Sequence, residues 1–184
     1  QSSHTKTGTG NAINTFCDLL LKIRTHLEQY EADRDLGPSL LSPTYVRAGS
    51  RSETGVNPGH IGSSIEIRTA PKIDPDILFK EIERLVVSTE DELRLNQPEA
   101  RIELTDLISC PPLNTNDSNV HIRKLKKLGY GVGFSRGSSD AKWANCPAIE
   151  LGPKGYDIHG LNEKIEITSL QSFYNHLLTF LNEL

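Results

Sequence analysis

Two kinds of apolar periodicity alternate within residues 1–106, and this order constrains the fold more than any other feature of the chain. Apolar side chains recur at every third or fourth position over residues 11–30, which predicts an amphipathic helix. A second such period follows the pair Asp74-Pro75, which is typical of a helix start, and ends near Thr89. Shorter segments with the character of strands separate and follow the two helices.

Three of those segments indicate strands. Residues 44–47 have strand composition, and residues 61–68 place isoleucines on one side and polar side chains on the other. Residues 101–105 alternate again. With an extended opening segment, the order is strand, helix, strand, strand, helix, strand. This order predicts an α+β fold of the βαββαβ, ferredoxin-like kind: a two-layer sandwich with two helices on one antiparallel sheet.

The chain changes character after a Pro- and Asn-containing linker near residue 112. Beyond it we expect a basic helix ending at Gly129, a buried strand over residues 148–151 and a final helix from about Thr168. The apolar face of that helix comprises Leu170, Phe173, Leu177, Leu181 and Leu184. Such an α/β pattern has too few strands for a sheet of ordinary size. The sequence therefore predicts one domain over residues 1–112 and an incomplete part of another over residues 113–184.

Composition excludes several classes of protein. The 184 residues are 36% apolar and 24% charged, with a net charge of -4 and no basic stripe, which argues against nucleic acid as the partner. No apolar stretch approaches the roughly 20 residues that span a bilayer, and the first residues lack the features of a signal peptide. Three widely spaced cysteines fit reduced thiols and a cytoplasmic location. The absence of Met and the start at Gln1 lead us to expect a piece of a longer protein.

His159 is the first candidate for chemistry, because we expect it in a loop after the buried strand 148–151. A neutral imidazole at such a position can bind zinc. A metal site needs three or four ligands, however, and a single loop histidine is more often solvated or part of a cap. The residues around it must therefore decide between the two interpretations.

Those residues carry a resemblance to a known family. The run contains Ser139-Asp-Ala-Lys142, then Pro147-Ala-Ile-Glu-Leu-Gly-Pro153, then His159-Gly-Leu-Asn-Glu163 and a closing amphipathic helix. It resembles the C-terminal signature of the dinuclear zinc aminoacylase and carboxypeptidase family, which includes succinyl-diaminopimelate desuccinylase and acetylornithine deacetylase. The resemblance implies that His159 binds one of two zinc ions. Sites of this kind also accept cobalt or manganese.

The first half of the chain is similar to the lid domain of the same family, which forms homodimers. Ser3-His4 precedes Asn11-Ala-Ile13, as a comparable pair precedes the first lid helix in the family. The resemblance implies that His4 reaches the active site of the partner subunit and stabilises the oxyanion there. The alternative is a solvated histidine near a terminus.

Two further matches concern substrate binding. Arg68 follows Pro58 by ten residues, and in the family the corresponding arginine binds a substrate carboxylate; a cross-strand ion pair is the alternative. The loop Gly137-Ser138-Ser139 precedes a short helix, and the family uses a similar loop to hold a carboxylate, although it also fits an ordinary turn. The family asparagine three residues before the proline is Gly55 here, so the resemblance does not assign that role to Asn57.

The resemblance implies a metal-dependent amidohydrolase that cleaves the amide bond of an N-acyl amino acid or peptide with zinc-activated water. The family's His-x-Asp and Glu-Glu motifs are absent, so we expect this chain to be inactive alone and to expose the apolar face of its final helix. Two alternatives remain open. Residues 1–112 could serve as a stand-alone dimerisation module, or the chain could be an amino-acid-binding regulatory domain without catalysis.

Overall fold

A computed structural model of the chain describes residues 10–49, 56–105, 107–137, 139–144 and 146–182. Two of the predicted site residues, His4 and Ser138, lie outside these ranges. The chain forms two compact units, Gln1–Ser109 and Cys110–Leu184. The assignment of a lid over residues 1–112 and a catalytic segment over residues 113–184 stays a prediction.

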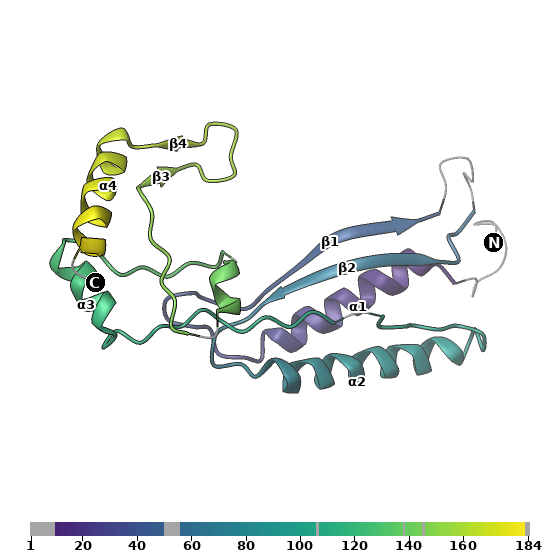
Figure 1. Ribbon diagram of the computed structural model, residues 1–184. Helices are drawn as coiled ribbons and strands as arrows, with labels where there is room; N and C mark the ends of the chain where they lie inside the picture. Colours follow the sequence, from purple (N-terminus) through teal and green to yellow (C-terminus); the bar gives the residue numbers. More distant parts are fainter. Residues whose placement is uncertain (1–9, 50–55, 106, 138, 145, 183–184) are drawn as a thin grey trace. The chain divides into compact units, whose positions relative to one another are not determined.

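Figure 1 shows the helices and strands of both units. The first unit contains α1 (Ala12–Leu27), β1 (Leu40–Ala48), β2 (Ile61–Arg68) and α2 (Pro75–Arg94). The second contains α3 (Val120–Lys127), the 3-10 helix η1 (Asp140–Trp143), β3 (Gly155–Tyr156), β4 (Lys164–Ile165) and α4 (Ile167–Asn182). Helices combined with small antiparallel sheets confirm the α+β class. The four-stranded ferredoxin-like sandwich is not confirmed, because residues 101–105 form no strand and the predicted opening strand falls on residues outside the described part.

Both long helices of the first unit begin at a residue whose side chain caps the helix, Asn11 for α1 and Asp74 for α2. The carboxylate of Asp74 accepts hydrogen bonds from the backbone N–H groups of Asp76 and Ile77 at 2.9 and 3.2 Å, and Pro75 occupies the first helical position. The Asn11 side chain caps α1 in the same way. The predicted end of α2 near Thr89 is wrong, since the helix continues to Arg94.

β1 and β2 pair in an antiparallel hairpin whose register shifts between Pro43 and Tyr45. Proline has no N–H for a ladder and is therefore found in strands at edges and bulges, where Pro43 lies. The Thr44 hydroxyl, at the shift, donates to the carbonyl of Ser64 at 3.3 Å. Because β1 tolerates this proline, it begins at Leu40 and is longer than the strand predicted over residues 44–47.

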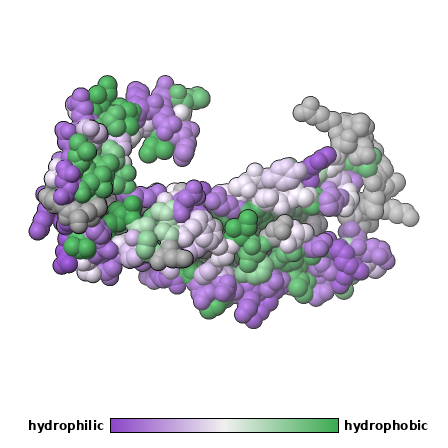
Figure 2. Space-filling model, in the orientation of Figure 1, coloured by the Kyte–Doolittle hydropathy of each residue, from purple (hydrophilic) through white to green (hydrophobic). Residues whose placement is uncertain are grey.

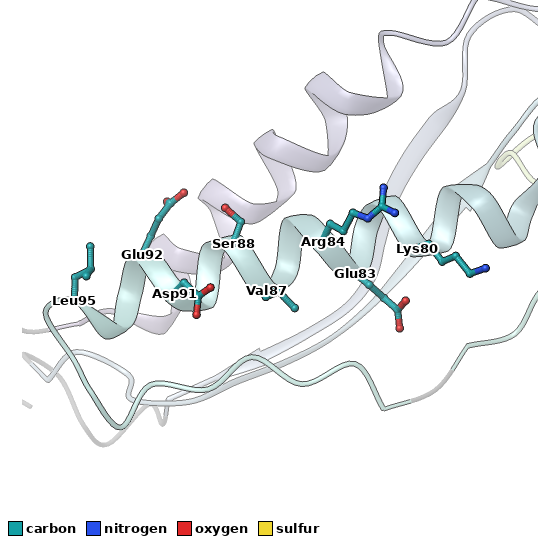
Figure 3. Close-up of a pocket in the computed structure, with 8 residues that line it drawn as sticks. All are labelled: Lys80, Glu83, Arg84, Val87, Ser88, Asp91, Glu92 and Leu95. Carbon is teal, nitrogen blue, oxygen red and sulfur yellow. The ribbon is translucent and has the colours of Figure 1, made fainter.

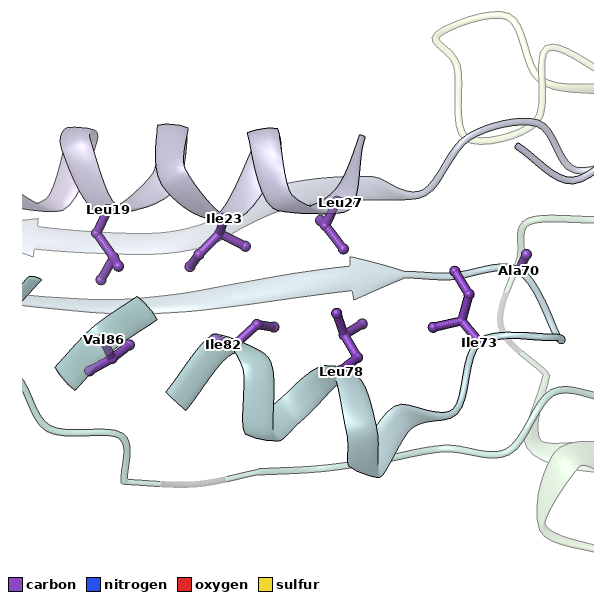
Figure 4. Close-up of a cluster of buried hydrophobic side chains, with 8 residues drawn as sticks. All are labelled: Leu19, Ile23, Leu27, Ala70, Ile73, Leu78, Ile82 and Val86. Carbon is purple, nitrogen blue, oxygen red and sulfur yellow. The ribbon is translucent and has the colours of Figure 1, made fainter. Parts of the chain in front are cut away.

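The core of the first unit lies where α1, α2 and the hairpin meet. Figure 4 shows side chains of α1 directed toward those of α2, with two residues of the β2–α2 connection at one end. The buried members are Leu19, Ile23, Leu27, Ala70, Ile73, Leu78, Ile82 and Val86. Leu41 and Ile67, which face each other across the hairpin, pack against this cluster from the sheet. The opposite face of β2 carries the alternate polar positions, including Arg68.

The strand predicted over residues 101–105 is wrong. These residues belong to no strand, although Ile102 packs against the core and its N–H donates to the Glu90 carboxylate at 2.7 Å. Its contact with the core explains the apolar alternation without a strand. In the described part of the first unit, the sheet therefore has two strands, β1 and β2.

α3 ends in a Schellman motif at Gly129, where the sequence predicts the end of the basic helix. Gly129 has a φ of 92°, and its N–H donates to the carbonyl of Lys126 at 3.1 Å. The N–H of Tyr130 donates to the carbonyl of Leu125 at the same distance. α3 contacts α4 through the edge-to-face ring pair of His121 with Phe180, and Tyr130, which follows the helix end, contacts His176 in the same geometry.

The buried strand predicted over residues 148–151 is also wrong. These residues form no strand, and Ile149 and Glu150 are exposed. The sheet of the second unit is instead the short hairpin β3–β4, in which Gly155 faces Ile165 and Tyr156 faces Lys164. No helix within the described residues is both long and apolar enough to cross a membrane.

Candidate functional site

Arg68 is the last residue of β2 and lies on the sheet face opposite the core. Its Nε and Nη2 atoms donate to the two carboxylate oxygens of Glu66 at 3.0 and 3.2 Å, and both side chains are 43% exposed. This ion pair runs along one strand, because Glu66 and Arg68 are two residues apart on the same face of β2. Exposed pairs contribute only about 0–1 kcal/mol, so Glu66 holds the guanidinium in a fork geometry that a substrate carboxylate could take over.

The loop before η1 is built by its own hydrogen bonds. The Gly137 N–H donates to the Ser135 hydroxyl at 2.9 Å, and the Ser139 hydroxyl accepts from the Ala141 N–H at 3.1 Å as the cap of η1. The predicted short helix after this loop is therefore confirmed, with Ser139 at its start. These bonds agree with the interpretation as an ordinary turn. Its role as a carboxylate cradle stays a prediction.

His159 lies in the loop that joins β3 to β4, not after a buried strand. Its φ is 64°, in the left-handed region that histidine adopts more readily than most residues, and its side chain is exposed. The neighbouring Asp157 organises the loop: its carboxylate accepts from the Asn162 N–H at 2.9 Å, and its carbonyl accepts from the Gly160 N–H at 2.7 Å. A Cβ at Gly160 would collide with the Asp157 carboxylate, so this arrangement of the loop requires glycine there.

Glu166 connects the hairpin to α4 and is a residue that sequence reasoning missed. Its carboxylate accepts hydrogen bonds from Tyr156 at 2.8 Å and Thr168 at 2.9 Å, and lies 3.5 Å from Lys154 Nζ. The Tyr156 and Thr168 hydrogen bonds, with the charge of Lys154, hold the pKa of Glu166 below its ordinary value. The carboxylate therefore stays ionised and positions the loop. Tyr156 reaches Glu166 because β3 pairs with β4 in this register, and no sequence pattern predicts that pairing.

The described residues do not fit a metal centre by themselves. No group of three or more His, Cys, Asp or Glu side chains lies close enough within the described ranges to hold an ion. A zinc ion needs three or four such ligands. Any metal that His159 binds would need further ligands from outside the described part of the chain.

Two hollows lie on the described surface of the first unit. One follows α2 between Lys80 and Leu95, and Figure 3 shows its lining side chains, which come from this helix and its C-cap residue Leu95. The other lies at one end of the β1–β2 hairpin and is lined by Arg47, Asn57 and His60, among others. Neither is lined by Arg68, so the hollows and the predicted substrate contact are separate features of this unit.

Nearly the whole chain is similar to one curated enzyme. It is 25% identical over 180 residues to the succinyl-diaminopimelate desuccinylase of Ehrlichia chaffeensis. The alignment covers 94% of this chain but only 45% of the desuccinylase, so the chain spans less than half of that protein's length. No family model matches the chain.

This likeness extends over both units and is not confined to the motif around His159, because 180 aligned residues include nearly the entire sequence. It supports a resemblance at the level of the family. Within the chain, Arg68 lies in the first unit, whereas Gly137, Ser139 and His159 lie in the second. Their roles, and that of His4 and Ser138 outside the described ranges, stay predictions.

Proposed function

We propose that this chain is part of a metal-dependent amidohydrolase that releases an acyl group from an N-acyl amino acid, with zinc as the metal. The observation that carries the proposal is the desuccinylase alignment, which runs through both units and includes the separate motifs around Arg68 and His159. A succinyl or acetyl group on an amino acid is the substrate class that the resemblance implies. Cobalt or manganese would serve in place of zinc at such a site.

Each candidate residue then has one task. His159, on an exposed loop, would supply an imidazole to a metal whose other ligands come from elsewhere. Arg68 would exchange Glu66 for the substrate carboxylate. The loop of Gly137, Ser138 and Ser139 would hold a carboxylate with its amides and hydroxyls, and His4 of a second copy would stabilise the oxyanion.

The proposal is tested by measuring amide hydrolysis when this chain is combined with the rest of a desuccinylase. The part of the Ehrlichia desuccinylase outside the alignment would be co-expressed with the chain, and N-succinyl and N-acetyl amino acids would be supplied with zinc. We expect hydrolysis by the pair, none by the chain alone, and loss of hydrolysis in His159→Ala. The exposed His60 provides the control, since His60→Ala should retain activity. Undiminished hydrolysis in His159→Ala would contradict the assignment of the metal ligand.

We also propose a homodimer formed through the first unit. β1 pairs only with β2 among the described residues, which leaves its other edge available for a strand of a second copy. On α1, Leu21 is 57% exposed and lies between the exposed residues Asp18 and Arg24. A two-fold axis at Leu21 would bring Asp18 of one copy to Arg24 of the other, in two equivalent pairs.

Sedimentation velocity tests this dimer. Leu21→Glu places a carboxylate on the two-fold axis and should convert the dimer to a monomer. Val87→Glu, at a position on α2 that is 59% exposed, is the matched control and should leave the dimer intact. A wild-type chain that sediments as a monomer at high concentration would refute the proposal.

A further inference from the structure

α4 has an unusual composition for a helix on a protein surface. Its 16 residues include no Asp, Glu, Lys or Arg, and none of them is buried. Helices that face water normally carry charged side chains, whereas the centres of protein interfaces are depleted of them. The composition of α4 is therefore that of a helix covered by other protein.

The apolar residues of α4 form two adjacent surfaces. One contacts α3 and the residues that follow it, through the ring pairs of Phe180 with His121 and His176 with Tyr130. The other is a stripe at intervals of three and four residues whose side chains are 43% to 69% exposed, which we call the α4 stripe: Ile167, Leu170, Tyr174, Leu178 and Leu181. At 100° per residue these five positions fall within one narrow arc of the helix. Figure 2 shows apolar atoms gathered over α4 on the face in view.

The β3–β4 hairpin extends this apolar surface. Its backbone is tied to the first turn of α4, because the Lys154 N–H donates to the Ser169 hydroxyl at 2.9 Å. Ile158 and Leu161, on either side of His159, are 65% and 103% exposed. Among the described residues of the second unit, only Ile122 and Leu125 are buried apolar residues. This unit therefore presents far more apolar surface than its own elements cover.

We infer that the α4 stripe is a docking surface, and that its occupant is a polypeptide equivalent to the part of the desuccinylase outside the alignment. This inference rests on the proposed function. More than half of the desuccinylase has no counterpart in this chain, which is enough polypeptide to supply a facing layer. The absence of charge on α4 means that an uncharged, apolar partner surface fits it without leaving a buried ion unpaired. The exposed loop of His159 adjoins the same surface, so docking would bring the missing ligands toward that histidine.

Complex formation tests the inference independently of catalysis. The full chain and the uncovered part of the Ehrlichia desuccinylase would be co-expressed, and the complex measured by size-exclusion chromatography with light scattering and by thermal melting. We expect an equimolar complex that melts at a higher temperature than the chain alone. Leu178→Glu should weaken the complex at least tenfold. Thr179→Glu, at an exposed position on the polar side of the same helix, should bind as the wild type does.

Dye binding by the chain alone provides a second measurement. A dye that fluoresces on apolar surfaces should bind the wild type and Thr179→Glu equally, and Leu178→Glu less. Absence of a complex, or equal binding of the partner by Leu178→Glu, would overturn the inference. Self-association of the chain that Leu178→Glu abolishes would overturn it too, because the occupant would then be a second copy. A complex without hydrolysis would uphold the docking surface and contradict the proposed function.

Discussion

The imidazole Nε2 of His26 lies 2.9 Å from the carboxylate of Glu81, joining the last turn of α1 to the first half of α2. The hydroxyl of Tyr30 donates to the same carboxylate. Nearer the other end of α2, Lys22 Nζ donates to the Thr89 hydroxyl at 3.2 Å and lies 2.6 Å from Glu92. The two helices are therefore held together by polar contacts at two levels beside their apolar core.

The Glu81 contacts predict a loss of stability in acid. Hydrogen bonds from Tyr30 first, and from His26 second, hold the pKa of Glu81 below its ordinary value. A carboxylate with a lowered pKa stabilises the fold above the pKa of the unfolded chain, about 4.3, and this contribution is lost as the pH falls through the lower folded pKa. We therefore expect the urea midpoint to fall as the pH is lowered through this window.

Glu81→Gln should flatten that pH dependence and lower the midpoint at neutral pH. Glu83→Gln, an exposed position two residues away on α2, is the control and should keep the wild-type profile. Urea unfolding followed by helical circular dichroism at several pH values measures both. Identical profiles for the wild type and Glu81→Gln would show that the Glu81 contacts do not cause the loss of stability in acid.

The sequence predicts the first unit well where local signals decide the structure. Helix period and capping residues locate α1 and the start of α2, because a side chain such as Asp74 bonds N–H groups only two and three residues away. Strand 61–68 is correct because its isoleucines face a core that the helices also supply. Local rules suffice for these elements.

Prediction fails where a segment needs a distant partner. Residues 101–105 and 148–151 have strand patterns, but a strand forms only beside another strand, and neither segment has one in the described structure. The candidate site has the same limit. The sequence identifies His159 through a resemblance, whereas the contact of Glu166 with Tyr156 follows from strand pairing that composition does not reveal.

The core of the first unit predicts a large effect at Ile23. This side chain is 2% exposed and lies in the cluster between α1 and α2. Ile23→Ala should lower the free energy of unfolding by about 2–5 kcal/mol, because it removes buried methyl groups and leaves a cavity. Val87→Ala, at an exposed position, should change it by less than about 0.5 kcal/mol. Chemical denaturation followed by circular dichroism measures both, and equal effects would mean that Ile23 is not in the core.

The cap of α2 predicts a smaller and chemically specific effect. Asp74→Ala removes the oxygen that accepts from Asp76 and Ile77, and should lower the free energy of unfolding by about 0.5–2 kcal/mol. Asp74→Asn keeps an acceptor and should retain most of the stability. Thermal melts of the two variants under the same conditions distinguish them. A similar loss in both would indicate that the charge of Asp74, and not its hydrogen bonds, stabilises the helix start.

The end of α3 provides a test of the second unit. Gly129 has a φ of 92°, a conformation in which a side chain adds strain, although a Cβ at this position would have no atom within 4 Å. Gly129→Ala should therefore lower the free energy of unfolding by about 1–2 kcal/mol through backbone strain alone. Gly131 also has open space for a Cβ but no positive φ, so Gly131→Ala should be neutral or slightly stabilising. Urea unfolding followed by helical circular dichroism measures both variants. Equal stability of the two variants would show that the Schellman motif does not set the end of α3, and that contact of Tyr130 with α4 holds the turn instead.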